Sequence, residues 1–309
     1  MRKTLLTIFG TIVVKAATLT FSACTGSGAG DATADSAAVR PDSARLVASP
    51  AGFTEPEAVR YDPDQDVYFV TNWGGGPVEA KDNNGFISRM RPDGAVDSLR
   101  FIAGRSRGAT LHSPRGMTIV GDTLWVVDAD AVRGFNRRTG APIATIDFSR
   151  FTLGFLNDIA ASPDALYVTD TGTDHIYRIS RRAITVALHD SVLGKPNGIT
   201  WDAGQSRFVV VPYGGDSVIR SWTAGNSALT EVGRSGGAKF DGVEILSGGR
   251  VLVASQGDSS IHLFSGGRGR AVVKTGGAPA DIAVDTKRNR VAVPFVDRNL
   301  VEIWQLPPQ

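Results

Sequence analysis

Six short segments of the chain begin in the same way, and this repeat limits the possible folds more than any other feature. Each segment opens with one leading residue, continues with Ala, Gly or Asp, and then runs into alternating apolar residues. A second run, rich in β-branched residues, follows each one. Four of the five intervals between leading residues are about 40 residues long, which is the repeat length of a propeller blade. The leading residues are Glu57, Arg115, Asn157, Asn197, Asp241 and Ala280.

Each repeat contains enough strand-like runs for one four-stranded sheet. A third run alternates apolar and polar residues, as in 86–91 and 175–179. A fourth strand-like run can be recognised in five of the six repeats. The last repeat ends one strand short, and residues 44–49 before the first repeat can supply that strand, which leaves no open sheet edge. The sequence therefore predicts an all-β, six-bladed β-propeller with four antiparallel strands per blade and a ring closed by an N-terminal strand.

Other patterns along the chain agree with this fold. After the N-terminal segment, no window of roughly 11–18 residues has the apolar spacing of an amphipathic helix. The first interval is longer because of an insertion, Asn72–Gly85, which we expect to form an extended loop on the face where the inner strands begin. A pair of β-sandwiches is the alternative fold, but it would not place six segment starts in the same register.

Composition excludes several classes of protein. Hydrophobic residues make up 42% of the 309 residues, so we expect a large core. The formal net charge is +2 and the basic residues are scattered, which gives no case for a nucleic-acid partner. A single cysteine allows no disulfide within the chain. We expect a monomer that acts on a small molecule.

Residues 1–23 have the features of a bacterial export signal rather than of the fold. Arg2 and Lys3 precede a mostly apolar stretch, and Phe21-Ser-Ala leads directly to Cys24. Small residues before this cysteine resemble a lipobox, which implies cleavage before Cys24 and acylation of its thiol. An ordinary secretory signal with an incidental cysteine is the alternative.

The chain after the signal divides into a tether and one domain. Residues 24–43 are rich in Gly, Ser, Ala and Asp, which is typical of a flexible tether. Residues 44–309 hold the predicted propeller. Because acyl chains would hold the protein to a membrane, we expect an exported bacterial lipoprotein that faces the periplasm or the cell exterior.

Side-chain oxygens stand at four of the six leading positions. The innermost strand of each propeller blade lines the axial channel, so Glu57, Asn157, Asn197 and Asp241 would converge at one mouth. We interpret the Gly or Asp that follows five of the leading residues as a turn residue that lets the backbone approach the axis. Two carboxylates and two amides suit calcium, with its about six to eight oxygen ligands, better than zinc. The alternative is a polar channel closed by hydrogen bonds or by an ion pair of Arg115.

The order of these residues resembles that of a known family. Glu57 in the first blade, Asn157 in an Asn-Asp start, Asn197 in a Pro-Asn-Gly start and Asp241 in an Asp-Gly start look like the senescence marker protein (regucalcin), gluconolactonase and related six-bladed lactonases. The resemblance implies that Glu57, Asn197 and Asp241 bind a metal ion, with Asn157 beside it. It further implies that Asp241 helps to activate water or acts as the base, and that the bound ion polarises a lactone carbonyl.

The chain departs from the family pattern at positions that would contact the substrate. The first blade has Glu-Ala-Val where the family usually has Glu-Gly-Pro, and the Arg often found two places before Asn157 is missing. That arginine would contact a sugar-like substrate, so its absence argues against an aldonolactone. Arg115 is a candidate replacement in substrate binding. His112, in a loop that leads to the same mouth, is a second candidate and could carry a proton.

Two functions from different classes remain open. The first is a calcium-dependent hydrolase of a lactone or related ester, with the metal at the mouth of the channel and Asp241 as catalytic residue. The second is a non-catalytic, lipid-tethered propeller that binds a protein or a small ligand, since propellers host both classes. The ring of oxygens favours the hydrolase, whereas the missing family residues and the lipid tether favour the binding protein.

Overall fold

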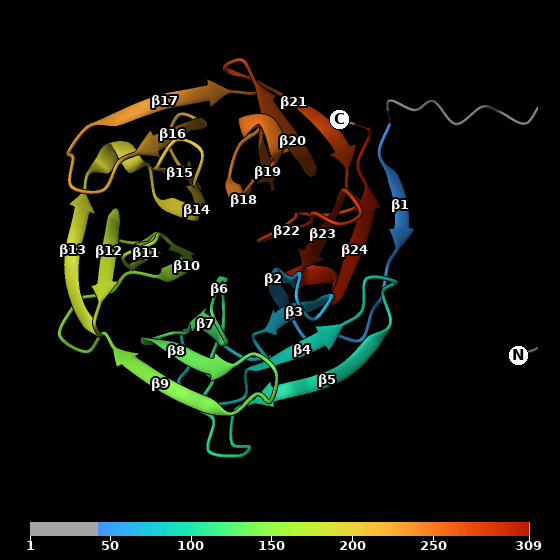
Figure 1. Ribbon diagram of the computed structural model, residues 1–309, viewed down its shortest axis with the longest axis vertical. Coiled ribbons are helices and arrows are strands. Elements are labelled where there is room, and N and C mark those ends of the chain that lie inside the picture. The colour runs from blue at the N-terminus through green and yellow to red at the C-terminus, as the bar shows by residue number, and fades with distance from the viewer. Residues whose placement is uncertain (1–42, 309) are drawn as a thin grey trace, which may run out of the picture. The chain divides into compact units, whose positions relative to one another are not determined.

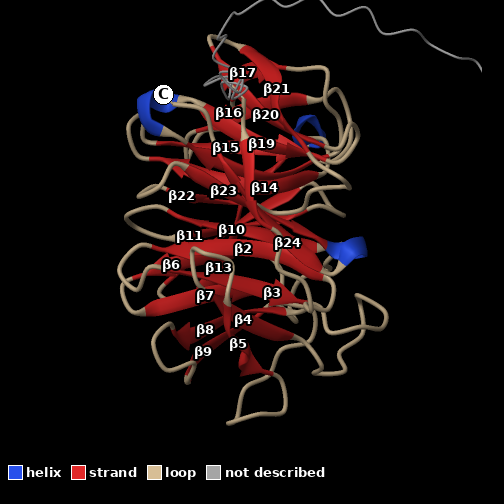
Figure 2. Ribbon diagram, turned by 90° about the vertical axis from the view of Figure 1, so that its right-hand side faces the viewer, coloured by secondary structure: helices blue, strands red, loops and turns tan. Residues whose placement is uncertain are grey.

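The computed structural model describes residues 43–308. The predicted signal segment and Cys24 lie outside these residues, as does the predicted tether apart from Ser43. In the part of the chain that is described, no helix has the length and apolar character needed to cross a membrane. Secondary structure there is almost entirely β, with turns and three short 3-10 helices between the strands (Figure 2).

The strands form six blades of four strands each. Blades one and two consist of β2 (Pro56–Asp62), β3 (Val67–Asn72), β4 (Phe86–Met90), β5 (Val96–Ala103), β6 (Met117–Val120), β7 (Thr123–Val127), β8 (Ala131–Asn136) and β9 (Pro142–Asp147). Blades three and four consist of β10 (Leu156–Ala161), β11 (Leu166–Asp170), β12 (His175–Ser180), β13 (Ala183–His189), β14 (Pro196–Asp202), β15 (Arg207–Pro212), β16 (Val218–Trp222) and β17 (Leu229–Arg234). Blades five and six consist of β18 (Phe240–Ile245), β19 (Val251–Ser255), β20 (Ser260–Ser265), β21 (Arg268–Lys274), β22 (Ala283–Asp285), β23 (Arg290–Phe295), β24 (Leu300–Gln305) and β1 (Arg45–Ala48). The 3-10 helices are η1 (Ser191–Leu193), η2 (Ser247–Gly249) and η3 (Val296–Arg298).

Each blade is an antiparallel sheet whose first strand along the chain lies nearest the axis. Figure 1 shows β2, β6, β10, β14, β18 and β22 around the centre of the ring, with strands such as β5, β9 and β13 at the rim. Blades four and five share one eight-stranded sheet, because a single parallel bridge joins Arg234 of β17 to Arg268 of β21. The predicted all-β propeller of four-stranded blades is confirmed.

Strand β1 closes the ring. It pairs antiparallel with β24, with Arg45 opposite Gln305 and Leu46 opposite Trp304. The sixth blade therefore takes its outermost strand from the segment that precedes the first blade, as the sequence predicts. This pairing covers the edge that β24 would otherwise expose.

The core lies between neighbouring blades. Between blades six and one, Tyr68 and Val70 pack with Val301 and Ile303, and all four side chains are fully buried. Middle strands such as β11 are buried at every position, whereas the outermost β13 is mostly exposed or half-buried and leaves Val186 exposed. The alternating runs of the sequence form third strands such as β4 and β12, which are mostly buried, so the solvent-exposed residues lie mainly on the fourth strand of each blade.

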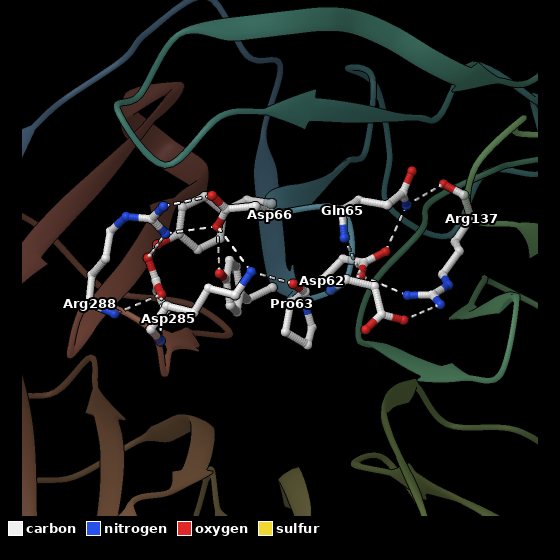
Figure 3. A network of polar contacts seen from close by, with 11 residues as sticks. Asp62, Pro63, Gln65, Asp66, Arg137, Asp285 and Arg288 are labelled. Atoms are coloured by element: carbon white, nitrogen blue, oxygen red, sulfur yellow. Dashed lines mark hydrogen bonds and ion pairs between the residues drawn. The ribbon is translucent and has the colours of Figure 1, made fainter.

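The turn between β2 and β3 ties blade one to both neighbours, at the end of β2 that lies away from Glu57. Arg137 of blade two donates hydrogen bonds to Asp62 at 2.7 Å and to Asp64 at 2.5 Å. Arg288 of blade six donates to both carboxylate oxygens of Asp66, at 2.8 and 2.6 Å. Figure 3 shows the two arginines on opposite sides of this turn, so one short loop clamps three blades.

Candidate functional site

Four of the inner strands contain a β-bulge at the leading residue. The pairing of β2 with β3 shifts between Pro56 and Val59, and equivalent shifts occur in β10, β14 and β18. A bulge places two residues of one strand opposite one residue of its partner and re-aims their side chains. In blades two and six the inner strand begins only after the leading residue. The four bulges hold Glu57, Asn157, Asn197 and Asp241.

Close contact between inner strands explains the glycines that follow the leading residues. A Cβ atom on Gly198 would lie 2.2 Å from the backbone oxygen of Asp241. One on Gly116 would lie 2.2 Å from Oδ1 of Asp158. Glycine is therefore needed here because neighbouring blades approach one another at the axis, so the predicted close approach of the backbone is confirmed and the predicted turn is wrong.

The aspartates at the equivalent positions do not form turns either. Asp158 lies within β10, and both Asp158 and Asp281 are almost fully buried. Oδ2 of Asp158 accepts a hydrogen bond from the backbone N–H of Ile199 at 2.8 Å, which joins blade three to blade four. The backbone N–H of Asp281 donates to the carbonyl of Glu57 at 3.0 Å, which joins blade six to blade one. These residues tie the inner strands together next to the mouth.

A cavity of about 310 Å³ opens at the mouth of the channel. All four predicted metal ligands line it, so the structure brings Glu57, Asn157, Asn197 and Asp241 to one place. Arg115 and His112, the predicted substrate contacts, do not line it. The other lining residues are Trp73, Phe155, Thr171, Tyr213, Gln256, Ala280 and Val296.

Five of these additional residues share one position in their blades. Each directly follows the second strand, which runs antiparallel to the inner strand and therefore ends beside the start of it. The residue one place after each second strand is thus the sequence signal that identifies this wall of the cavity. The five residues are Trp73, Thr171, Tyr213, Gln256 and Val296.

Hydrogen bonds fix several polar groups of the cavity but leave two carboxylate oxygens without a partner. Nε2 of Gln256 donates to Oδ2 of Asp241 at 2.7 Å, and Nδ2 of Asn157 donates to Oγ1 of Thr171 at 2.9 Å. Oε2 of Glu57 and Oδ1 of Asp241 are buried and accept no hydrogen bond. Buried carboxylate oxygens rarely lack a hydrogen-bond partner. Burial removes their hydration, and without a partner nothing offsets that free-energy cost.

Burial raises the pKa of both carboxyl groups. Desolvation is the largest cause for Glu57, and the nearby charge of Asp241 adds to it, whereas the charge of Arg115 lowers the pKa. The pKa of Glu57 therefore lies well above its usual range. Desolvation, with the charge of Asp158, raises the pKa of Asp241 to about 7, against the lowering effect of the nearby Asn197 amide and of the hydrogen bond from Gln256. Two anions at this mouth carry an electrostatic penalty that a bound cation would remove.

The donor set fits a hard divalent cation. Two carboxylates and two side-chain amides line the cavity, and none of the lining residues is His or Cys. Because Asn157 uses its amide nitrogen for Thr171, its carbonyl oxygen is left for a ligand. A bare ion is smaller than a water molecule and can reach oxygens that water cannot. Coordination would give Glu57 Oε2 and Asp241 Oδ1 the partner that they lack.

Arg115 supports one wall of the cavity instead of pairing with a carboxylate across it. Its guanidinium carbon lies 3.6 Å from the centre of the Phe155 ring. Nη1 donates to the carbonyl of Leu156 at 2.5 Å, Nη2 donates to the carbonyl of Val78 at 3.3 Å, and Nε has no partner. Val78 belongs to the insertion, so Arg115 also holds that loop against blade three.

His112 belongs to a second group of potential metal ligands, outside the cavity. Ligand atoms of His112, Asp128 and Asp130 lie within 4.8 Å of one another. Both aspartates already accept hydrogen bonds from Arg133, at 2.6 and 3.0 Å, and Nδ1 of His112 accepts one from the backbone of Asn83 at 3.1 Å. These contacts hold the insertion next to blade two, and a cation there would displace Arg133. The contact of His112 with substrate stays a prediction.

Comparison with known proteins supports the fold. No protein-family model matches the chain, and no curated protein matches it. A gluconolactonase from Xanthomonas campestris has a similar structure, with a TM-score of 0.65, 15% identity, and coverage of 87% of this chain and 99% of that one. A putative gluconolactonase gives a TM-score of 0.64 at 16% identity and covers 85% of this chain and 91% of its own.

A third similar structure is a catalytically inactive variant of virginiamycin B lyase from Staphylococcus aureus, with quinupristin. Its TM-score is 0.56 at 14% identity, and the match covers 85% of this chain and 100% of that one. At such low identities these likenesses show a shared fold, and they do not show a shared activity.

Proposed function

We propose that this protein is a hydrolase of lactones or related esters that depends on a divalent cation, with calcium as the expected ion. The observation that carries the proposal is the pair of buried oxygens without hydrogen-bond partners, Glu57 Oε2 and Asp241 Oδ1, on two residues of one cavity. Asn157 and Asn197 would complete the protein ligands. The name gluconolactonase, which two solved structures of similar fold carry, supports this class of reaction.

The residues of the cavity have separate tasks in this proposal. A cation bound by the four side chains would polarise the ester carbonyl and stabilise the negative charge that develops on its oxygen. Asp241 takes the proton from the attacking water, and the hydrogen bond from Gln256 at 2.7 Å fixes the orientation of its carboxylate. Trp73, Phe155 and Val296 form walls that limit the access of other water molecules.

The lining of the cavity favours hydrolysis over the reaction of a lyase. The similar virginiamycin B lyase is inactive when one of its histidines is replaced by alanine. None of the residues that line this cavity is a histidine, whereas two are carboxylates. A carboxylate can serve as a general base toward water beside a metal ion, so the residues present suit hydrolysis.

The cellular location is part of the same proposal. The predicted export signal and the lipobox-like segment before Cys24 support a location outside the cytoplasmic membrane, with the propeller on a lipid anchor. Its substrate there would be a small molecule.

The test combines metal binding with turnover. The purified full-length protein is stripped with a chelator, titrated with calcium in a calorimeter, and assayed against a panel of lactones and aryl esters before and after calcium is added. We expect one bound calcium ion and hydrolysis only in its presence. Asp241→Asn should weaken calcium binding by at least about 100-fold and abolish turnover, because it removes a charged ligand and the base.

Asp122→Asn is the matched control. The side chain of Asp122 is 69% exposed, and Asp122 lies in the β6–β7 turn, so this variant should bind calcium and turn over as the wild type does. Hydrolysis that persists in the chelator would overturn the metal dependence. Calcium binding without turnover of any lactone or ester would instead identify a non-catalytic binding propeller.

A further inference from the structure

The polar side chains of the mouth cavity are already engaged with one another. Oγ1 of Thr171 donates to a backbone carbonyl at 2.7 Å and accepts from Asn157 at 2.9 Å. Gln256 donates to Asp241 at 2.7 Å, and its Oε1 accepts from the Tyr213 hydroxyl at 3.4 Å. With the four ring residues assigned to a cation, the indole N–H of Trp73, which is buried and has no partner, is the main donor left for a substrate.

No positively charged side chain compensates for this. None of the lining residues is Lys or Arg. Arg115 is close, but two of its nitrogens donate to the carbonyls of Leu156 and Val78. A sugar-derived lactone carries several hydroxyl groups, and most of them would lose their hydration on entry without gaining a partner, because one indole N–H cannot serve them all. The cavity therefore selects against a polyhydroxylated substrate.

The remaining wall is apolar and largely aromatic. Trp73, Phe155 and Tyr213 come from blades one, three and four, and Ala280 and Val296 come from blade six. The guanidinium of Arg115, 3.6 Å from the ring centre, fixes the position of Phe155. The volume of about 310 Å³ is at the small end of ligand cavities, which range over about 300–1,000 Å³. Such a cavity suits one or two fused rings.

We propose that the substrate is a small lactone or ester with an apolar aryl or alkyl body, and not a sugar-derived lactone. The apolar body packs against Trp73, Phe155 and Val296, and the carbonyl group faces the ring of oxygens. The preference for an apolar body rests on the cavity walls alone. The ester group as the reacting group rests on the proposed function above.

The reaction is a hydrolysis that needs water as its only co-reactant. The water oxygen forms a bond with the carbonyl carbon, and the ring C–O bond of the lactone breaks. The proton that Asp241 takes from water is returned to the leaving oxygen. The product is the open-chain hydroxy acid, and no group is oxidised or reduced.

The first arm of the test measures binding without turnover. The probe is 3,4-dihydroquinolin-2-one, a bicyclic lactam whose amide resists hydrolysis, titrated into the calcium-loaded full-length protein in a calorimeter. We expect binding that Val296→Thr weakens by about tenfold, because the added hydroxyl has no partner in the apolar wall. Val192→Thr is the matched control, since Val192 is 51% exposed in η1, and should leave binding unchanged.

The second arm compares turnover of two lactones. Dihydrocoumarin, the ester analogue of that lactam, is assayed beside glucono-1,5-lactone under the same conditions. We expect kcat/KM for dihydrocoumarin to exceed that for the sugar lactone by at least about 100-fold, because most of the sugar hydroxyls find no partner.

The two arms separate this inference from the proposed function. Lactam binding that is sensitive to Val296→Thr, without turnover of either lactone, would support the apolar specificity and contradict the hydrolase. Equal or faster turnover of glucono-1,5-lactone would overturn the apolar specificity while keeping the hydrolase. Absence of lactam binding would also overturn it.

Discussion

The carboxyl group of Asp241 is buried, accepts one hydrogen bond from Gln256, and has one oxygen without a partner. Its pKa of about 7 is higher than the value of about 3.9 in an unfolded chain. Without a cation, the folded protein therefore binds more protons than the unfolded chain between about pH 4 and pH 7. The contribution of Asp241 to stability is fully present below about pH 4 and is lost as the pH rises through 7.

This loss of stability at high pH leads to a prediction for Asp241→Asn in the presence of a chelator. At pH 8 the variant should have a higher free energy of unfolding than the wild type, by up to about 4 kcal/mol, since the shift spans about three pKa units of about 1.4 kcal/mol each. At pH 4 the difference should disappear. Urea unfolding at both pH values measures it, with Asp122→Asn as the exposed control. A variant that is less stable than wild type at pH 8 would contradict the prediction.

The sequence predicts the charged and amide residues of the cavity better than its apolar wall. Glu57 and Asp241 lie in one cavity because the repeat defines equivalent positions, and their chemistry is legible in the sequence. Trp73 and Val296 share a position directly after the second strand of their blades, but they are different types of residue. Residue type therefore did not identify them as one wall of the cavity. Arg115 has the charge of a substrate contact, but its long side chain stacks on Phe155, and that direction depends on tertiary packing.

At the level of the element, the inner strands approach one another more closely than side chains would allow. The lack of a side chain at Gly198 lets β14 contact the backbone of β18 beside Asp241. The sequence predicts the close approach of the backbone at these glycines, but it wrongly predicts a turn there, since Gly198 lies within β14. Register between blades, which determines this contact, cannot be derived from the strand pattern of one blade.

Gly198→Ala should therefore damage both stability and the mouth. The new Cβ would lie 2.2 Å from the Asp241 backbone oxygen, and overpacking of this kind costs about 1–3 kcal/mol. Chemical unfolding measures that loss, and calcium titration should show weaker binding because Asp241 is displaced. Gly236→Ala is the control, since its Cβ would meet no atom within 4 Å. Wild-type stability in Gly198→Ala would show that the inner strands can separate freely.

At the level of the molecule, the repeat predicted the number of strands per blade and the closing strand. Period-2 patterns specify strands, and a ring of repeats leaves one way to pair the first with the last. The bridge between Arg234 and Arg268, which merges two blades into one sheet, had no signal. This bridge depends on how closely the outermost strands β17 and β21 of the two blades approach each other, which local sequence does not encode.

Removal of β1 tests the closure of the ring. A chain that starts at Pro50 should unfold about 5–10 °C below one that starts at Ser43, because it loses the β1–β24 hydrogen bonds and the packing of Val47 on the core. Differential scanning calorimetry measures the shift. Size-exclusion chromatography should also show oligomers, since the edge of β24 becomes open to other chains. Equal midpoints for the two chains would show that β1 does not contribute to closure.

The same closing strand affects the order of events during synthesis. Arg45 is made among the first residues of the propeller, yet its partner Gln305 belongs to β24, which is made after the other described strands. The first five blades can form as they emerge, because their strands pair with neighbours in the chain. The sixth cannot be completed until β24 has been made, and such distant contacts form slowly. Throughout that time β1 remains an unpaired strand, so a chaperone that shields it would shorten the period in which the nascent protein can aggregate.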